Sequence, residues 1–122
     1  MNADVHAGSI KKIEIEGCDT IPKLFWHQVR ARDGKTAFRE KTLGIWRSTS
    51  WREYGERARA VGMGLVSLGL ARGDVVSILA DTIPAWLYAD MGIMGAGGVS
   101  NGIYPTDAAK QVEYILNDSA TR

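Results

Sequence analysis

The chain has 122 residues, enough for one domain or part of one, and its 45% hydrophobic and 24% charged residues are ordinary globular values that argue against a disordered chain. Its formal net charge of +1 gives no overall attraction for nucleic acid or for an acidic membrane surface. Cys18 is the single cysteine, which excludes an intrachain disulfide and fits a reducing, cytoplasmic setting.

The chain divides into a flexible segment expected over residues 1–19 and a structured region over residues 20–122. The stretch Met1–Gly17 has no apolar run followed by a small-residue cleavage site, so no secretory signal peptide is predicted. Pro22–Arg32 is predicted to be a short helix, because proline fits a first helical turn and a Gly-containing turn signal follows.

His6 and His27 have no further histidine or cysteine at ligand spacing, so no metal site is predicted.

The next two elements are a hairpin and a long helix. Thr36–Glu40 and Ile45–Thr49 are short strand candidates, and Gly44 between them can take the positive φ that a tight turn needs. Ser50 opens the helix through a capping box with Glu53. The helix then carries one continuous apolar stripe and is expected to end at Gly69. The stripe consists of Tyr54, Ala58, Val61, Leu65 and Leu68.

Glycines inside this helix predict close packing. Gly62 and Gly64 each cost about 1 kcal/mol against alanine in a helix interior. We therefore expect another backbone to pack closely against both positions.

Charge is distributed unevenly along the chain. From Trp26 to Ala60 basic residues outnumber acidic ones, which indicates either a solvated face with pairs such as Glu53–Arg57 or an anion-facing surface.

The second half of the chain alternates strands and helices. Val75–Ala80 is apolar on both sides of its alternation, as in a parallel strand buried on both faces. A helix from Pro84 to about Ala96, a strand Val99–Tyr104 and a last helix Asp107–Asn117 follow. Thr106 is the expected cap of the last helix. The predicted fold class is α/β, with alternating strands and helices forming part of a mostly parallel sheet beside a small N-terminal hairpin.

A membrane span is not predicted. The longest apolar run, Ile83–Val99, is interrupted by Asp90 and by several glycines and a proline, whereas a span needs about 20 predominantly apolar residues.

A further strand should follow the last helix in a doubly wound fold, so we expect the chain to be cut at an element boundary.

No catalytic, cofactor-binding or metal-binding residue is assigned from the sequence. Gly95-Ala96-Gly97-Gly98 follows a helix and precedes a strand, the reverse of the order in a dinucleotide fingerprint, and is interpreted as packing glycine. Asp81 and Asp90 are the carboxylates nearest the apolar core. They are either a helix cap and a helix-face polar residue, or part of a ligand site at the strand ends near Tyr104. The scattered tryptophans do not form a nucleic-acid stacking platform.

An ordered set of short motifs resembles the N-terminal part of AMP-forming acyl-CoA synthetases, in the adenylate-forming superfamily, and in particular the long-chain fatty acyl members. No single motif is diagnostic, but their order is specific, and the resemblance runs from about Thr20 to Arg122. The motifs are Thr20-Ile21-Pro22-Lys23-Leu24, Arg39-Glu40-Lys41, Gly44-Ile45-Trp46, Ser50-Trp51-Arg52-Glu53-Tyr54, Leu68 to Val76, Pro84-Ala85-Trp86, Asp90, Gly95 to Val99 and Tyr104-Pro105-Thr106.

The resemblance implies an enzyme that joins a fatty acid to CoA and converts ATP to AMP and pyrophosphate, with Mg²⁺ on the phosphates. Residues 20–122 would be the truncated N-terminal part of its large adenylation domain. In this family the phosphate loop and the catalytic groups lie downstream of the matching region, so the chain alone is expected to be inactive. The partners implied are the remainder of the synthetase, fatty acid, ATP and CoA, but no nucleic acid.

The sequence also bears on an alternative function, on self-association and on location. The alternative function is a stand-alone, non-catalytic α/β interaction or assembly module that keeps the synthetase scaffold. A truncated sheet would leave an open edge and an uncovered apolar face, so self-association is expected. The parent enzyme is expected in the cytoplasm, with peripheral membrane association left open.

Overall fold

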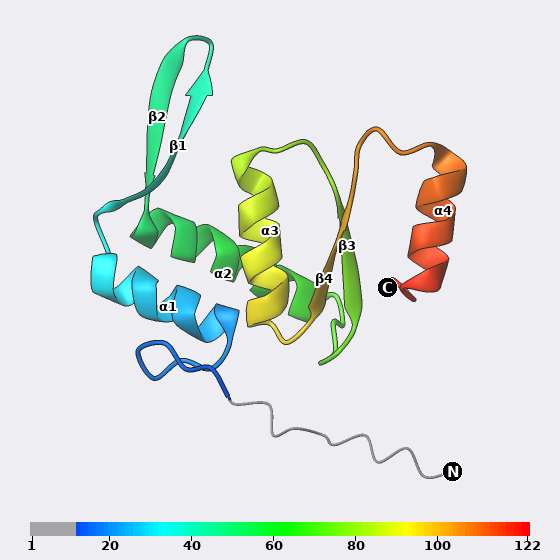
Figure 1. The fold of residues 1–122 in the computed structure, drawn as a ribbon, viewed down its shortest axis with the longest axis horizontal. Coiled ribbons are helices and arrows are strands. Elements are labelled where there is room, and N and C mark those ends of the chain that lie inside the picture. Colours follow the sequence, from blue (N-terminus) through cyan, green and yellow to red (C-terminus); the bar gives the residue numbers. More distant parts are fainter. Residues whose placement is uncertain (1–11) are drawn as a thin grey trace, which may run out of the picture.

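A computed structural model describes residues 12–122, so His6 and most of segment 1–19 lie outside the described residues. Figure 1 shows a helical layer beside a short parallel sheet, a hairpin that projects from the body, and a last helix at the opposite end. The mixed α/β prediction is confirmed. In chain order the elements are α1 (Ile21–Arg32), β1 (Thr36–Thr42), β2 (Ile45–Ser50), α2 (Trp51–Ser67), β3 (Val75–Leu79), α3 (Pro84–Gly95), β4 (Val99–Ile103) and α4 (Ala109–Asp118).

The N-terminal hairpin forms as predicted. β1 and β2 pair antiparallel with Thr42 opposite Ile45, which leaves a two-residue turn of Leu43 and Gly44. The φ angles of these two residues are 51° and 79°, as a turn with two left-handed central residues requires. The turn residue Leu43 is 96% exposed, so the tip of the hairpin points into solvent.

Local capping explains where α1 and α2 begin. The Thr20 hydroxyl accepts a hydrogen bond from the Lys23 amide at 3.3 Å. At α2, the Ser50 hydroxyl accepts from the Glu53 amide at 3.1 Å, and the Glu53 carboxylate accepts from the Ser50 amide at 2.8 Å. The predicted capping box is therefore confirmed, and two otherwise unpaired amides at the start of α2 are satisfied.

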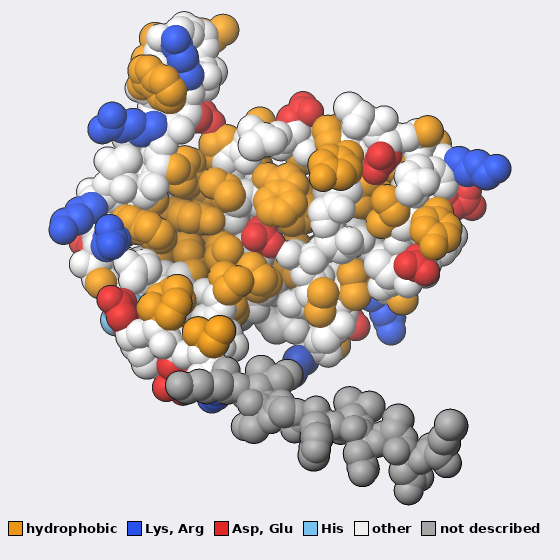
Figure 2. All heavy atoms as spheres, in the orientation of Figure 1, with side chains coloured by type: hydrophobic (Ala, Val, Ile, Leu, Met, Phe, Trp, Pro, Cys, Tyr) orange, Lys and Arg blue, Asp and Glu red, His pale blue; other side chains and the backbone are white. Residues whose placement is uncertain are grey.

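The core of the helical layer is aromatic. Phe25, Tyr54 and Ala58 are buried together, and neighbouring aromatic rings from α1, α2, α3 and β1 pack around them. The ring of Tyr54 lies edge-on to Phe25 at 4.7 Å and to Phe38 at 5.4 Å between ring centres. Figure 2 shows hydrophobic side chains gathered in a broad patch over this part of the molecule.

Helices α2 and α3 approach each other through a pair of glycines. A Cβ on Gly62 would lie 2.7 Å from the Gly92 carbonyl oxygen, and a Cβ on Gly92 would lie 2.7 Å from the Ala58 carbonyl oxygen. The predicted close packing at Gly62 is confirmed. The same prediction is wrong for Gly64, because nothing lies within 4 Å of its Cβ position.

The sheet consists of β3 and β4, which run parallel and are joined by α3. Thr121 also pairs parallel with Val75, and the Arg122 amide donates to the Val75 carbonyl at 2.9 Å. Since alternate residues of a parallel strand bond to opposite neighbours, this contact lies at the edge of β3 that faces away from β4. The expected further strand is thus represented by a single bridge beside β3.

Three expectations about this half are corrected. β3 is not buried on both faces: Ile78 is buried but Leu79 is 54% exposed, because α4 borders an open hollow beside Leu79 and covers it only in part. α3 is capped by Ile83 without a side-chain bond, so Asp81 is not its cap. α4 begins at Ala109, because a turn from Tyr104 to Asp107 comes first and Ala108, not Thr106, is its N-cap.

Among the described residues, no helix combines the length and the apolar character needed to cross a membrane.

Candidate functional site

The candidate site is a hollow of about 540 Å³ at the carboxyl ends of β3 and β4. Parallel strands place their carboxyl ends at one edge of the sheet, where ligands of open α/β folds bind. The segments that follow the two strands supply most of the lining. The lining residues are Ala80, Asp81, Thr82, Trp86, Gly102, Ile103, Tyr104, Pro105 and Thr106.

The structure brings together Asp81 and Tyr104, which the sequence placed near one another at the strand ends. Tyr104 is 76% exposed, so its ring forms a rim and not a floor. Sequence reasoning missed the contribution of Trp86 from α3. Trp86 packs against β4 at Gly102, where a Cβ would come within 3.1 Å of the indole ring. Glycine at this position is the sequence signal that an aromatic ring could approach the strand closely.

The donor set of this hollow does not fit ATP with its magnesium ion. Its lining contains one carboxylate, Asp81, and no lysine or arginine. Triphosphate recognition needs cationic side chains or a cradle of backbone amides, and Mg²⁺ binds through carboxylate oxygens together with the phosphates. Within residues 12–122, no group of three or more histidine, cysteine, aspartate or glutamate side chains is placed to hold a metal ion.

Asp90 has a different role from Asp81. It lies on α3, outside the hollow, and accepts a hydrogen bond from the Ser100 hydroxyl on β4. Near it, burial raises the pKa of Tyr54 to about 12, and the charges of Asp90 and Tyr88 add to this shift. The Tyr54 hydroxyl donates to the Leu87 carbonyl at 3.5 Å. These contacts tie α2 to α3 and α3 to β4.

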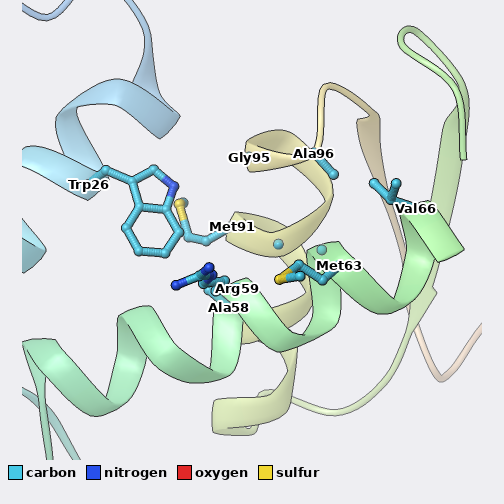
Figure 3. Close-up of a pocket in the computed structure, with 10 residues that line it drawn as sticks. Trp26, Ala58, Arg59, Met63, Val66, Met91, Gly95 and Ala96 are labelled. Carbon is cyan, nitrogen blue, oxygen red and sulfur yellow. The ribbon is translucent and has the colours of Figure 1, made fainter.

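A second, apolar hollow of about 300 Å³ lies between the three N-terminal helices. Figure 3 shows Trp26 entering from α1, Met91 from α3 and Met63 from α2, with Arg59 at the side. The Gly62–Gly92 contact contributes to its lining. The polar groups of its side chains are the guanidinium of Arg59 and the indole N–H of Trp26, and neither is a general base or a nucleophile.

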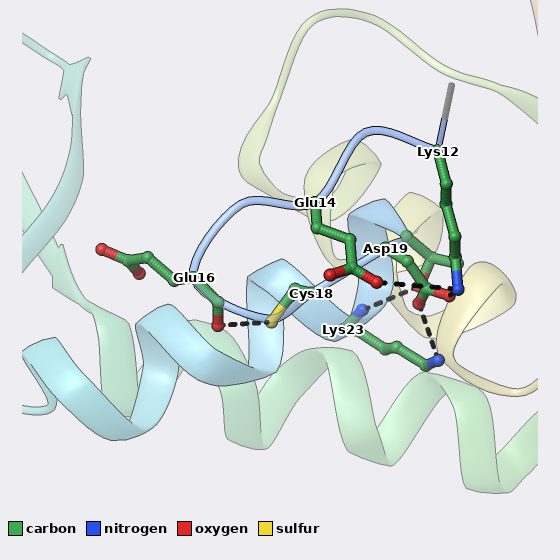
Figure 4. A network of polar contacts seen from close by, with 7 residues as sticks. Lys12, Glu14, Glu16, Cys18, Asp19 and Lys23 are labelled. Atoms are coloured by element: carbon green, nitrogen blue, oxygen red, sulfur yellow. Dashed lines mark hydrogen bonds and ion pairs between the residues drawn. The ribbon is translucent and has the colours of Figure 1, made fainter. Parts of the chain in front are cut away.

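The polar network before α1 is structural. Asp19 accepts hydrogen bonds from Lys12 and Lys23, each at 2.7 Å, and Figure 4 shows both ammonium groups converging on its carboxylate. These hydrogen bonds, from Lys12 first and Lys23 second, hold the pKa of Asp19 far below its usual value. Cys18 is half-buried, and its thiol donates to the Glu16 carbonyl at 3.8 Å. The network fixes residues 12–19 against the start of α1.

The basic residues between Trp26 and Ala60 do not converge on one anion site. The Arg52 guanidinium pairs with both oxygens of Asp33, with one contact at 2.8 Å. Arg57 lies 5.6 Å from the centre of the Tyr88 ring. The hydrogen bonds from Ser50 lower the pKa of Glu53, and the charge of Arg57 adds to this effect. Lys41 lies 5.8 Å from the Trp46 ring on the hairpin. The excess positive charge is spread over several faces.

Comparison with sequence families and curated proteins supplies the wider context. The model of the AMP-binding enzyme family matches residues 25–122. The long-chain-fatty-acid–CoA ligase FadD15 of Mycobacterium bovis is 38% identical over 101 residues, which are 83% of this chain and 17% of that protein. The long-chain-fatty-acid–CoA ligase ACSBG2 of Xenopus laevis is 32% identical over 117 residues, 90% of this chain and 16% of its own length. The chain thus spans about a sixth of these relatives.

Solved structures share the fold. A fatty acid AMP ligase from Legionella pneumophila superposes with a TM-score of 0.78 at 19% identity, over 85% of this chain and 19% of that one. The N-terminal subdomain of NpsA from Klebsiella oxytoca gives 0.75 at 20% identity, over 84% of this chain and 26% of that one. The anthranilate CoA ligase AuaEII, in complex with anthranoyl-AMP, gives 0.74 at 28% identity, over 83% and 19%.

Proposed function

The chain belongs to the AMP-binding enzyme family, and we propose that it is part of a long-chain fatty acid–CoA ligase that works through an acyl-adenylate. The observation that carries the proposal is the 38% identity to a long-chain-fatty-acid–CoA ligase over 83% of the chain. The 17% of that relative's length that the match covers supports the view that the remaining machinery belongs to a longer protein.

The proposed reaction has two steps. The fatty acid carboxylate attacks the α-phosphate of ATP, forms the acyl-adenylate and releases pyrophosphate. The CoA thiol then attacks the acyl carbonyl, forms the thioester and releases AMP. Because the strand-end hollow lacks cations for the phosphates and a carboxylate cluster for Mg²⁺, no step is assigned to a residue of this chain.

Residues 20–122 would serve as a scaffold for the rest of the enzyme. The aromatic core and the Gly62–Gly92 contact fix α1, α2 and α3 as one layer, and α3 holds β4 beside β3. The hollow near Asp81 and Tyr104 would then form one wall of a larger site, completed by other parts of the enzyme. A cytoplasmic location is proposed with it, in keeping with the single thiol of Cys18.

The test compares the 122-residue chain with the longer protein that contains it. With long-chain fatty acid, ATP, Mg²⁺ and CoA, the longer protein is expected to release pyrophosphate and form acyl-CoA, and the 122-residue chain to do neither. Clear turnover by the 122-residue chain would contradict the scaffold role. If the longer protein prefers an aromatic acid such as anthranilate, the fatty-acid assignment fails while the adenylation chemistry stands.

We also propose that the 122-residue chain self-associates through its sheet. Leu79 and Val99 are 54% and 50% exposed, and of residues 12–122 only Thr121 pairs at the other edge of β3. Light scattering of the chain is expected to show a dimer or larger species, and Leu79→Lys to shift it towards the monomer. A monomer at high concentration would contradict this proposal and leave the ligase assignment intact.

A further inference from the structure

The β1–β2 hairpin presents apolar side chains that no other part of residues 12–122 covers. Every residue from Lys41 to Ser48 is exposed. Leu43 at the turn is 96% exposed, and Ile45 and Trp46 are 63% and 64% exposed. Figure 1 shows the hairpin projecting away from the helical layer, and Figure 2 shows hydrophobic and basic groups together on it.

The charges of the hairpin are arranged around these apolar groups. Lys41 lies opposite Trp46 in the register, with its ammonium 5.8 Å from the indole ring. Arg47 lies opposite Glu40, whose carboxylate also accepts a hydrogen bond from the Thr42 hydroxyl. Counting Arg39, the hairpin carries three cations and one acid over residues 36–50, so it is basic although the whole chain is nearly neutral.

We infer that the tip of this hairpin inserts into an anionic lipid surface. A leucine at a protruding tip can enter the acyl region, while tryptophan prefers the interface and long basic side chains reach the phosphate groups. A stable protein–protein interface needs about 800 Å² from each partner, which a narrow two-stranded tip cannot bury. Lipid insertion has no such requirement, so the geometry favours a membrane over a protein partner.

Membrane insertion of the hairpin does not depend on the ligase reaction. It would place the body of the protein beside a membrane while leaving the strand-end hollow and the helical layer in water. Because the attraction combines charge and insertion, binding should need anionic lipid and should weaken as salt is raised.

The test is sedimentation of the 122-residue chain with vesicles. One set contains phosphatidylcholine alone, and the other contains equal parts of phosphatidylcholine and phosphatidylglycerol. We expect binding to the anionic vesicles and little to the neutral ones. The double variant Lys41→Gln/Arg47→Gln should bind the anionic vesicles roughly 30-fold more weakly, because each of the two basic groups near the surface is expected to contribute roughly fivefold to the affinity.

Two leucine variants distinguish insertion of the hairpin tip from non-specific hydrophobic adsorption to the vesicles. Leu43→Asn removes the apolar tip but suits the left-handed backbone of the turn, so the hairpin should persist. It should weaken anionic-vesicle binding about tenfold. Leu68→Asn is the matched control, because Leu68 is 86% exposed at the end of α2, and it should bind like the unmodified chain. Circular dichroism checks that all variants remain folded.

The proposal is overturned if the chain stays soluble with both vesicle types, as a hairpin that contacts only protein would. It is also overturned if Leu43→Asn and Leu68→Asn reduce binding equally, because the hairpin would then have no special role.

Discussion

The helical layer and the sheet with α4 differ in how completely they are packed. Phe25, Tyr54, Ala58 and Ile93 are buried in the helical layer or where α3 meets the sheet. In contrast, α4 has no buried residue, and β3 and β4 bury one residue each, Ile78 and Ile103. Since burial of apolar area is the main favourable term in folding, the helical layer should be stable by itself and the sheet region only marginally so.

The glycine contact between α2 and α3 offers the strongest way to break this comparison. Gly62→Ala places a methyl group 2.7 Å from the Gly92 carbonyl oxygen, which belongs to the backbone and cannot rotate away. We expect a loss of about 3 kcal/mol in the free energy of unfolding, measured by urea denaturation.

The matched control is Gly64→Ala on the same helix, where nothing lies within 4 Å of the added methyl group. This variant should gain up to about 1 kcal/mol from higher helix propensity. Equal effects at the two positions would show that the α2–α3 contact is not the element that holds the layer together.

The capping box of α2 gives an intermediate effect. Ser50→Ala removes the hydroxyl that accepts from the Glu53 amide and should cost about 1 kcal/mol in thermal or urea unfolding. Hydrogen bonds from the Ser50 amide and hydroxyl lower the pKa of Glu53. Its stabilising contribution is therefore present above the ordinary glutamate pKa and is lost as the pH falls through the lowered value. The variant should lose part of this acid dependence; an unchanged profile would contradict the role of the box.

The smallest effect at neutral pH is expected at Tyr54. Tyr54→Phe removes a weak hydroxyl contact and should cost less than about 1 kcal/mol. The pKa of Tyr54 is raised from 10.0 to about 12, so the folded state holds this proton more tightly than the unfolded state. Stability from this group is complete below pH 10 and is lost as the pH rises towards 12.

Alkaline urea denaturation should therefore show a steeper loss of stability in the unmodified chain than in Tyr54→Phe. Tyr114→Phe serves as the control for the substitution itself, because Tyr114 is 63% exposed on α4 and lies outside the aromatic core. Identical slopes for the unmodified chain and Tyr54→Phe would show that Tyr54 is not protected by the helical layer.

The two regions also differ in how far the sequence predicts them. The capping box and the hairpin were predicted correctly because their signals are local: Ser50 and Glu53 bond within one turn, and Gly44 sets the turn of the hairpin. Whether a helical glycine is in contact depends on what packs against it, so Gly62 and Gly64 could not be distinguished from the sequence.

The strand-end hollow was only partly predictable. The rule that parallel strands end at one edge placed Asp81 and Tyr104 near one another. Trp86 reaches the hollow from α3 through the crossover, which the sequence pattern does not specify. The cap predicted at Thr106 was wrong because a tight turn, formed by the Asp107 amide and the Tyr104 carbonyl, delays the start of α4.

Hydrogen exchange of the 122-residue chain, followed by mass spectrometry, tests the central contrast most directly. Amides of α2 and α3 should exchange slowly, because the glycine contact and the aromatic core protect them, whereas amides of α4 should exchange much faster. Equal protection of α2, α3 and α4 would contradict the account, because it would show that the sheet region is as stable as the helical layer without further chain.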